Sequence, residues 1–367
     1  MKVLILANHL NFGGITAYIK NLCKSLHGKE GVEVMVASRG GDLEKDLKAR
    51  GILCLRIPLT TKSEASPKVF WSFLKLRKKI KSLEIDLIHA NTRVTQVLAH
   101  LLSRATGVPV LTTCHGYFKR RLTRRLFPCW GKRIIAISDQ VQEHLIHDFK
   151  VDPEIIRLIY NGVDSERFSL YPKEDNSALK IGWGLNPDKK IIGHIGRLSS
   201  VKGQKFLVLA AALLLEARSD LQFLLIGDGP EKENLLALVR EKRLEGSFFI
   251  RPSVSDTSEA LRMMDVFVMP SLQEGLGISI LEAQACGVAV VASRVGGIPT
   301  IVADASTGLL VPAGDERALV FAISRLFSDE ALKRSVIQKA RMQVQEKFSL
   351  AIMAEKTRRL YKELCAC

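Results

Sequence analysis

The chain lacks an apolar run long enough to cross a bilayer. Its longest apolar stretch, FLVLAAALLL at residues 206–215, falls well short of the roughly 20 residues that a membrane-spanning helix needs. We therefore expect a buried helix there. The opening residues, MKVLILAN, contain neither a long apolar core nor a small-residue cleavage site, so we expect no signal peptide.

Paired-cysteine motifs and histidine clusters are also missing. The seven cysteines are scattered, and no two C-x-x-C motifs occur at zinc-site spacing. This pattern favours reduced thiols in a cytoplasmic protein, with a redox role for the terminal C-A-C pair as the alternative. His144 and His147 lack the carboxylate partner of the metalloprotease motif. We expect no metal and no cofactor.

Acidic residues are scarce in the first half of the chain. Residues 1–168 contain 28 Lys and Arg against 15 Asp and Glu, whereas residues 169–367 contain 26 against 23. The excess indicates an anionic partner: nucleic acid, an anionic bilayer or a phosphorylated acceptor. A basic surface that serves only solubility explains the total charge better than its asymmetry. Because no nucleic-acid-binding module is recognisable, we expect no nucleic-acid partner.

The order of elements predicts an α/β protein with two domains. At about 150 residues per domain, 367 residues suggest two. Short, almost wholly apolar runs alternate with helical stretches, which is typical of doubly wound parallel sheets. We expect strands at residues 3–7, 32–37, 54–57, 85–90, 108–114, 133–137, 157–159, 191–195, 221–226, 248–251, 266–269, 288–292 and 308–311. We expect helices at residues 15–26, 67–83, 94–105, 140–149, 203–216, 231–242, 258–264, 278–286, 316–327 and from 329 onward.

A polar, turn-rich segment, YPKEDNS at residues 171–177, separates the two patterns. We therefore predict an N-terminal acceptor-binding domain at residues 1–170 and a nucleotide-sugar-binding domain at residues 171–346. The helical residues 347–367 are expected to pack toward the N-terminal domain.

The strongest motif is PSLQEGLGISILEAQACG at residues 270–287. Open α/β sheets bind ligands at the carboxyl ends of their strands, and this motif follows a strand. Glu274 lies in a glycine-containing loop, and a helix that carries Glu282 begins near Ile278. Two carboxylates at this spacing suit the hydroxyls of one extended ligand, a sugar or a ribose. The alternative is one capping and one solvated glutamate. The predicted donor-binding residues here are Gly277, Ile278, Ser279 and Glu282, because free amides at a helix start hold diphosphates.

A second motif, IGRLSSVKG at residues 195–203, places two cations on a short loop after a strand. Arg197 offers a fork of donors and Lys202 a point charge, and together they suit a diphosphate leaving group. Fixed cations lower the barrier to glycosyl–phosphate cleavage and could replace a magnesium ion. Two solvated surface cations are the alternative. Gly196, which ends the strand, is assigned to donor binding.

Three weaker signals also follow strands. Gly13 and Gly14 form a turn that could face phosphates, although it is not G-x-G-x-x-G and an ordinary helix start is equally consistent with it. Gly227 lies in a G-D-G-P turn for which simple turn chemistry is the favoured alternative. His115 follows a strand and could donate to a sugar hydroxyl or to the acceptor, although a lone histidine is more often structural.

These residues resemble glycosyltransferase family 4, the retaining enzymes of GT-B fold. The resemblance covers nearly the whole chain and includes N-F-G-G, A-I-S, Y-N-G-V-D, G-R-L-S-x-x-K-G, G-D-G-P and E-G-L-G-I-S-I-L-E-A. It implies that Glu274 binds the donor sugar, Glu282 the ribose, and Arg197 and Lys202 the diphosphate. It also implies that Gly14 touches the phosphates, that His115 lies near the transferred sugar, and that no metal is needed.

Two positions depart from the family pattern. Thr300 stands where a glutamate is common after V-G-G-I-P, and Ala289 replaces a usual proline. Neither is among the predicted site residues. Both advise against copying a relative's donor preference.

Two basic, aromatic segments of the first half suit an anionic membrane or acceptor phosphates. Residues 116–133 hold seven cations and no acid, and the predicted contacts are Lys119, Arg120, Arg121, Arg124 and Arg125. Residues 67–83 add Phe70, Trp71, Phe73 and a run of lysines, for which a solvated helix face with buried aromatics is the favoured alternative.

The sequence favours a transferase that builds a bacterial surface glycan or lipopolysaccharide on a glycan or lipid-linked acceptor. It would act as a peripheral protein on the inner face of the cytoplasmic membrane. The alternatives are a nucleotide-sugar 2-epimerase, a sugar phosphorylase or a soluble disaccharide synthase on the same fold. A non-catalytic binding module is disfavoured by the complete set of predicted site residues.

Overall fold

The computed structural model describes residues 1–11, 13–61, 63–118, 122–169 and 176–366. Its contacts divide the chain into two units, Met1–Gly162 with Leu350–Cys367, and Val163–Ser349. The sequence had placed the boundary at residue 170 and the returning segment at residue 347. Of the predicted linker at residues 171–177, residues 171–175 lie outside the described residues, and Ser177 is the first residue of a helix.

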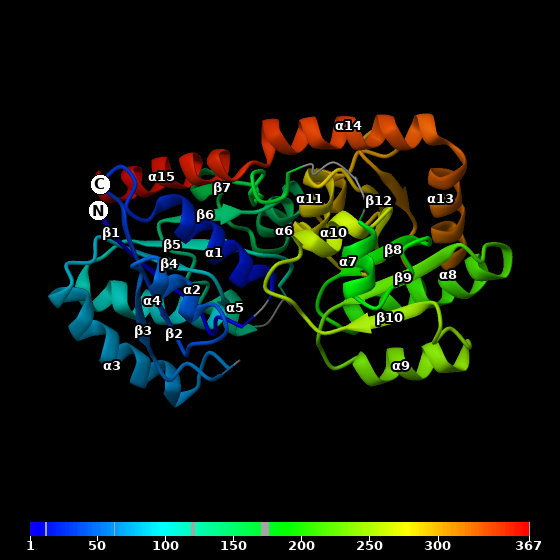
Figure 1. Cartoon of the computed structure of the whole chain (residues 1–367). Coiled ribbons are helices and arrows are strands. Elements are labelled where there is room, and N and C mark those ends of the chain that lie inside the picture. Colours follow the sequence, from blue (N-terminus) through cyan, green and yellow to red (C-terminus); the bar gives the residue numbers. More distant parts are fainter. Residues whose placement is uncertain (12, 62, 119–121, 170–175, 367) are drawn as a thin grey trace. The chain divides into compact units, whose positions relative to one another are not determined.

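The first unit is built on a seven-stranded parallel sheet in the order β3-β2-β1-β4-β5-β6-β7 (Figure 1). Strand β1 lies at its centre, where Leu4 is in register with Met35 on one side and Ile88 on the other. The strands are β1 Lys2–Leu6, β2 Glu33–Ser38, β3 Leu53–Arg56, β4 Leu87–Ala90, β5 Val110–Cys114, β6 Arg133–Ala136 and β7 Ile156–Leu158.

Helices cover both faces of this sheet, as its continuously apolar strands require. One core layer joins the sheet to α1 and the C-terminal helix α15, and the other joins it to α3 and α4. The helices are α1 Gly14–Leu26, α2 Glu44–Ala49, α3 Pro67–Ser82, α4 Arg93–Thr106, α5 Leu122–Leu126, α6 Asp139–Phe149, the 3-10 turn η1 Pro153–Ile155, and α15 Leu350–Ala366. The packing of α15 beside α1 confirms that the C-terminal helix returns to the N-terminal domain.

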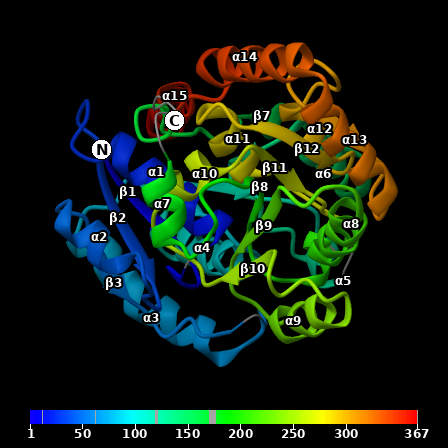
Figure 2. The same ribbon diagram turned by 45° about the vertical axis from the view of Figure 1, so that its right-hand side comes forward.

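The second unit holds a six-stranded parallel sheet in the order β10-β9-β8-β11-β12-β13. Its strands are β8 Lys190–Ile195, β9 Leu221–Ile226, β10 Phe248–Arg251, β11 Val266–Met269, β12 Ala289–Ser293 and β13 Leu309–Val311. Helix α8 packs between α9 and α13, and Figures 1 and 2 show α8 and α9 together beside the sheet. The helices are α7 Ser177–Gly182, the 3-10 turn η2 Ser200–Lys202, α8 Gln204–Ala217, α9 Lys232–Glu241, α10 Ser258–Met263, α11 Ile278–Ala285, α12 Ile298–Ile301, α13 Glu316–Ser328 and α14 Glu330–Lys347.

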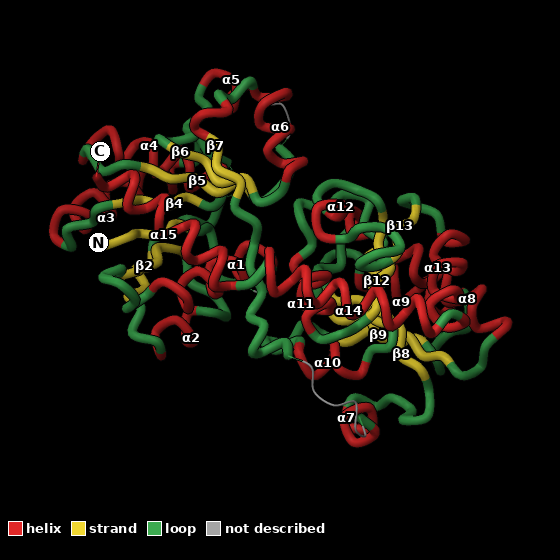
Figure 3. The backbone as a smooth tube through the Cα atoms, turned by 90° about the horizontal axis from the view of Figure 1, so that it is seen from above, coloured by secondary structure: helices red, strands yellow, loops and turns green. Residues whose placement is uncertain are grey.

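Local signals explain where the main helices begin and end. Thr92 and Thr95 form a capping box at the start of α4, and Gly107 ends that helix in the left-handed conformation. Near the C-terminus the predicted helical stretch is divided, because the amide of Val163 donates to the Phe348 carbonyl at 2.8 Å between α14 and α15. Within the described residues, no helix is both long and apolar enough to traverse a membrane. Figure 3 shows that, within each unit, the strands lie side by side among the helices.

Candidate active site

The predicted phosphate-binding loop and the predicted sugar-binding loop meet at one point of the second sheet. Strand β8 is flanked by β9 on one side and β11 on the other, so the chain's winding reverses between β8 and β11. In open α/β sheets ligands bind outside the carboxyl ends of the strands at such a switch point. Arg197 and Lys202 follow β8, and Glu274 follows β11. The topology therefore brings these three residues to one edge of the sheet, although Lys202 and Glu274 are 72 positions apart in the sequence.

Lys202 and Glu274 form an ion pair across this edge. The Lys202 ammonium donates to the Glu274 carboxylate, and their side chains are only 22% and 13% exposed. Water screens the attraction between the Lys202 ammonium and the Glu274 carboxylate less than it would at an open surface, because both side chains are partly buried. Arg197 lies on the same loop with its side chain exposed. Glu274 thus neutralises Lys202, whereas Arg197 is exposed to solvent.

Two residues that the sequence analysis missed hold the Arg197 loop. Gln204, the first residue of α8, donates from Nε2 to the Arg197 carbonyl at 2.8 Å and lies 3.3 Å from the ring of His194. His194 is fully buried in β8, and burial lowers its pKa to about 4, so its ring is neutral at pH 7. The sequence contains one indication of the role of Gln204, because this residue directly follows the glycine turn at Gly203.

Helix α11 begins beside Glu274. Gly277 has φ of 96°, a left-handed conformation that favours glycine, and it precedes the first helical residues Ile278 and Ser279. The first amides of a helix have no intrahelical acceptor, and the helix dipole favours an anion there. The Glu274 carbonyl accepts the amide of Gly297 at 3.0 Å, which fixes the loop from its other side.

Glu282 lies on the same helix in a poorly solvated position. Its carboxylate accepts the Thr257 hydroxyl at 3.3 Å, a partner not identified from the sequence. Burial raises the pKa of Glu282 to about 7, although the charge of Arg167 opposes this shift. The carboxylate is therefore poised between its two protonation states near neutral pH.

This pKa predicts a pH-dependent effect of Glu282→Gln. Because the folded pKa lies above the unfolded value, the unfolding free energy falls as pH rises from about 4.5 to about 7. A glutamine keeps the Thr257 hydrogen bond without ionising. We expect the variant to gain about 2 kcal/mol of stability near pH 8 and nothing near pH 4, as measured by urea unfolding. An equal gain at both values would show that ionisation is not the cause.

The predicted donor-binding glycines after β8 and β9 have a packing role. A Cβ atom at Gly227 would lie 2.0 Å from the carbonyl oxygen of Gly196, and one at Gly196 would lie 3.1 Å from the ring of His194. The loops after β8 and β9 therefore touch through their backbones. The close approach of the Gly196 carbonyl oxygen is enough to explain why residue 227 has no side chain.

In the first unit, His115 lies at the end of β5 and contacts Asn91 at the end of β4. The His115 Nε2 atom is 3.0 Å from the Asn91 Oδ1 atom, while the Asn91 amide nitrogen donates to the carbonyls of Leu6 and His89 at 3.4 Å each. Oδ1 must then accept, so Nε2 carries the proton and Nδ1 is an acceptor. Burial lowers the pKa of His115 to about 3, which keeps the ring neutral. The sequence analysis expected this ring to donate to a ligand, but its only donor is used by Asn91.

Behind His115 lies a buried polar chain that the sequence did not reveal. Thr113 accepts or donates at 2.7 Å to His89, whose other ring nitrogen is 2.7 Å from the hydroxyl of Tyr361 on α15. Tyr18 lies 3.3 Å from Thr113 and packs edge-on against the His115 ring at 4.8 Å. The C-terminal helix therefore supports the position of His115 through side chains.

Gly13 and Gly14 stand at the end of the loop after β1, where α1 begins. The switch point of this sheet lies between β1 and β4, so the loop occupies its ligand-binding edge. Among the described residues, no atom lies within 4 Å of a Cβ built at either position. Packing within the chain therefore does not explain these two glycines.

The basic segment after β5 behaves differently from the sequence prediction. Lys119, Arg120 and Arg121 lie outside the described residues. Arg124 is only 6% exposed, and its guanidinium lies 3.8 Å from the centre of the Phe118 ring and 5.3 Å from that of Trp130. The prediction that Arg124 contacts a membrane or acceptor is wrong, because its charge is covered by aromatic rings. Arg125 is exposed.

The two neighbouring arginines give a matched test of this arrangement. We expect Arg124→Ala to cost about 2 kcal/mol of stability, because it removes cation–π contacts and leaves a gap beneath the rings. Arg125→Ala should stay within about 0.5 kcal/mol of the parent. Urea unfolding of the two variants compares them directly, and equal costs would contradict the buried position of Arg124.

Comparison with known proteins decides the family. Residues 12–167 match the model of Glycosyltransferase Family 4, and residues 175–343 match that of Glycosyl transferases group 1. The α-maltose-1-phosphate synthase of Mycolicibacterium smegmatis is 32% identical over 76% of this chain and 79% of its own length. The chain belongs to glycosyltransferase family 4.

Two further proteins place this glycosyltransferase among its relatives. The Escherichia coli UDP-Gal:α-D-GlcNAc-diphosphoundecaprenol α-1,3-galactosyltransferase is 27% identical over 84% of this chain and 83% of its own length. The Anabaena HepE protein, solved in complex with UDP and glucose, has a TM-score of 0.87 at 22% identity, covering 99% of this chain and 100% of that one. The two parallel sheets thus form the Rossmann-like units of a GT-B fold, as the sequence predicted. Within the described residues of this glycosyltransferase, no cluster of three or more His, Cys, Asp or Glu side chains could hold a metal.

Proposed function

We propose that this glycosyltransferase transfers a sugar from a nucleoside diphosphate sugar to a glycan or lipid-linked acceptor. The observation that carries the proposal is the Lys202–Glu274 ion pair at the switch point of the second sheet. An anionic diphosphate that displaces Glu274 from Lys202 frees the carboxylate at the moment a sugar arrives beside it. The solved HepE complex with UDP and glucose supports a donor of this class. Because the galactosyltransferase relative is also named for a UDP-sugar, we propose UDP as the nucleotide of the donor.

The predicted binding residues of the second unit each contact one part of the donor in this proposal. Arg197, Lys202 and the amides of Ile278 and Ser279 bind the diphosphate and stabilise the charge that forms on it as the glycosyl bond breaks. Glu274 accepts hydrogen bonds from the sugar, and Glu282 accepts them from the ribose. Side-chain cations supply the positive charge that other enzymes obtain from a metal, so we propose a metal-independent reaction.

The first unit is assigned to the acceptor. The neutral His115 ring presents an acceptor atom at Nδ1, suited to a hydroxyl of the acceptor or of the transferred sugar. Gly13 and Gly14, which the sequence assigns to donor binding, leave space for phosphate oxygens of the donor near the start of α1. The galactosyltransferase relative acts on a diphosphoundecaprenol-linked sugar, and the basic first half of this chain suits an anionic membrane or acceptor phosphates. We propose a peripheral protein on the inner face of the cytoplasmic membrane that contributes to surface-glycan or lipopolysaccharide synthesis.

The test combines a panel of nucleotide sugars with lipid-linked and soluble acceptors. We expect transfer that depends on the acceptor, persists in chelator and keeps the anomeric configuration of the donor, as read by NMR. Conversion of a nucleotide sugar without an acceptor would instead indicate an epimerase. Reversible cleavage of a glycoside by inorganic phosphate would indicate a phosphorylase, and a strict need for magnesium would contradict the role of the two cations.

A further inference from the structure

Helix α3 exposes large apolar side chains on its outer face. Val69, Leu76 and Ile80 face the core, whereas Phe70 is 55% exposed and Trp71 is 61% exposed. The sequence analysis favoured buried aromatics in this segment, and for these two residues that expectation is wrong. An aromatic pair in water loses the burial that normally stabilises such side chains, so the pair is suited to a contact outside the unit.

The same helix is strongly basic. Residues 67–82 include six Lys and Arg and no acid. The acids nearest to the helix in sequence have other partners, since Glu64 pairs with Arg93 and Glu84 with Lys2. Within the described part of the chain, no carboxylate pairs with the five cations of the second half of α3, Lys75, Arg77, Lys78, Lys79 and Lys81. Five exposed cations without a carboxylate partner make this helix suited to an anionic counterpart.

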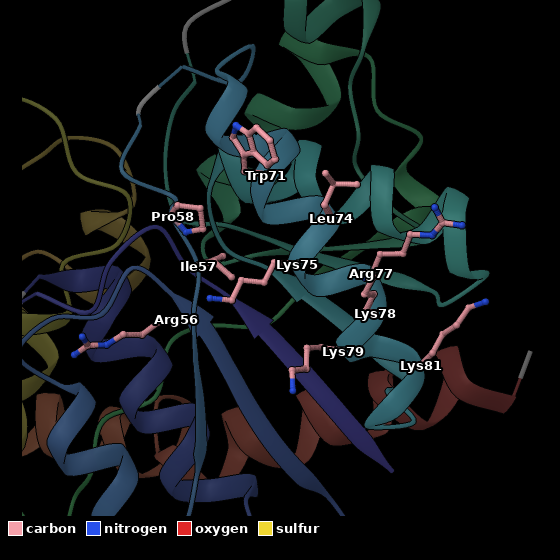
Figure 4. A pocket seen from close by; sticks show the side chains of 10 residues that line it. All are labelled: Arg56, Ile57, Pro58, Trp71, Leu74, Lys75, Arg77, Lys78, Lys79 and Lys81. Atoms are coloured by element: carbon pink, nitrogen blue, oxygen red, sulfur yellow. The ribbon is translucent and has the colours of Figure 1, made fainter.

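A groove of about 1090 Å³ runs along this helix. The segment Arg56–Pro58 forms one part of its lining, and Trp71, Leu74 and the five cations form the rest. Figure 4 shows Trp71 at one end, Lys75 and Lys79 extending to one side of the helix, and Arg77 and Lys81 extending to the other. The surface therefore has an apolar end and a long cationic margin.

A second apolar patch is fixed close to the start of α3. Leu122, Leu126 and Phe127 are 69%, 64% and 68% exposed around α5. Arg93 joins this patch to α3, because it donates to the Phe127 carbonyl and to the Glu64 carboxylate at 2.7 Å each. Glu64 lies three residues before α3, so the half-buried Arg93 links the second patch to the segment that leads into this helix.

We propose that the outer face of α3 docks on an anionic lipid bilayer. Phe70, Trp71 and Leu74 enter the boundary between headgroups and acyl chains, and the cations lie among the headgroup phosphates with their stems along the apolar surface. The exposed leucines favour lipid over nucleic acid, because aliphatic side chains insert into acyl chains but do not stack on bases. The inference rests on the membrane part of the proposed function and names the surface that performs it.

Vesicle sedimentation tests this surface with the full chain. Phosphatidylglycerol–phosphatidylcholine vesicles should bind the protein, pure phosphatidylcholine vesicles should bind it poorly, and high salt should weaken binding. Arg77→Gln with Lys78→Gln should reduce partitioning about 30-fold, the equivalent of about 1 kcal/mol per cation at an anionic surface. Phe70→Ser with Trp71→Ser should reduce it at least about tenfold.

Helix α13 provides matched controls. It carries Phe321, which is 71% exposed, between the exposed Arg317 and Arg325. Phe321→Ser and the pair Arg317→Gln with Arg325→Gln should leave vesicle binding unchanged. Equal losses from α3 and α13 variants, or no binding by the parent chain at low salt, would overturn the proposal. All variants should retain the parent melting temperature and UDP affinity, which separates loss of docking from loss of the sugar-transfer site.

Trp71 reports the contact directly. The chain has two other tryptophans, Trp130, which is only 8% exposed, and the half-buried Trp183. The difference in fluorescence between the parent and Trp71→Phe therefore isolates the exposed α3 side chain. Anionic vesicles should shift that emission to the blue, and brominated lipids should quench it. If an oligonucleotide binds through α3 while brominated lipids leave Trp71 unquenched, the surface serves nucleic acid and the lipid proposal fails.

Discussion

Glu274→Gln is expected to reduce kcat by about a thousandfold while UDP binds as tightly as before or a few times more tightly. The Glu274 carboxylate has two successive partners in the proposed reaction, Lys202 before the donor binds and the sugar hydroxyls afterwards. A glutamine cannot offer a charged acceptor to the sugar in the transition state, so catalysis falls. It also competes less for Lys202, so the diphosphate meets a freer cation. Steady-state kinetics and UDP calorimetry measure the two effects separately.

Glu259→Gln is the matched control for this experiment. Glu259 is an exposed carboxylate on α10 of the same unit, and its replacement should change neither kcat nor UDP affinity. If Glu274→Gln retained kcat, the assigned sugar-binding role would be wrong. If it lost UDP affinity together with kcat, the carboxylate would act in nucleotide binding rather than on the sugar.

Lys202→Met is expected to weaken UDP binding by about 30- to 100-fold. A hydrogen bond to a charged group contributes about 1.5–3 kcal/mol, and methionine keeps the stem but removes the charge. The loss should be much smaller for a nucleoside without phosphates, because the ammonium is assigned to the diphosphate. Lys205→Met, three residues further along at an exposed site on α8, should bind UDP normally. An equal loss for the nucleoside would show that the variant distorts the site as a whole.

The double variant Lys202→Met with Glu274→Gln tests whether the two substitutions affect UDP binding independently. Removing Lys202 alone leaves Glu274 partly buried without its partner, which adds a cost unrelated to the ligand. In Lys202→Met with Glu274→Gln, that cost is absent. We expect Glu274→Gln to improve UDP binding more in the Lys202→Met background than in the parent, which is a positive coupling in the double-mutant cycle.

The fold could be predicted because each strand is a short apolar run ended by a turn. All thirteen predicted strands are present, since burial on both faces of a strand leaves a nearly continuous apolar run in the sequence. The short helices α2, α5, α7 and α12 were not predicted, because four to six residues carry little periodicity, although α10, which has six residues, was predicted. The division of the final helical stretch was also missed, because it depends on a hydrogen bond between Val163 and Phe348, residues 185 positions apart in the numbering.

For the candidate active site, the sequence indicated which loops carry the binding residues but not which side chains those residues contact. Glycines and charged residues directly after strands can be identified from the sequence alone, so Arg197, Lys202 and Glu274 could be placed at one sheet edge. The roles of Asn91, Gln204 and Thr257 depend on contacts between distant segments, which no local pattern encodes. The prediction for Arg124 was wrong for the same reason. A run of basic residues in the sequence does not reveal that Phe118 and Trp130 cover the Arg124 guanidinium.

A crystal structure with bound UDP tests the central claim most directly. The account predicts that the diphosphate lies at the ends of β8 and β11, with an oxygen about 2.8 Å from the Lys202 ammonium and Glu274 released from it. A diphosphate bound elsewhere on the chain, with the Lys202–Glu274 pair still intact, would contradict it.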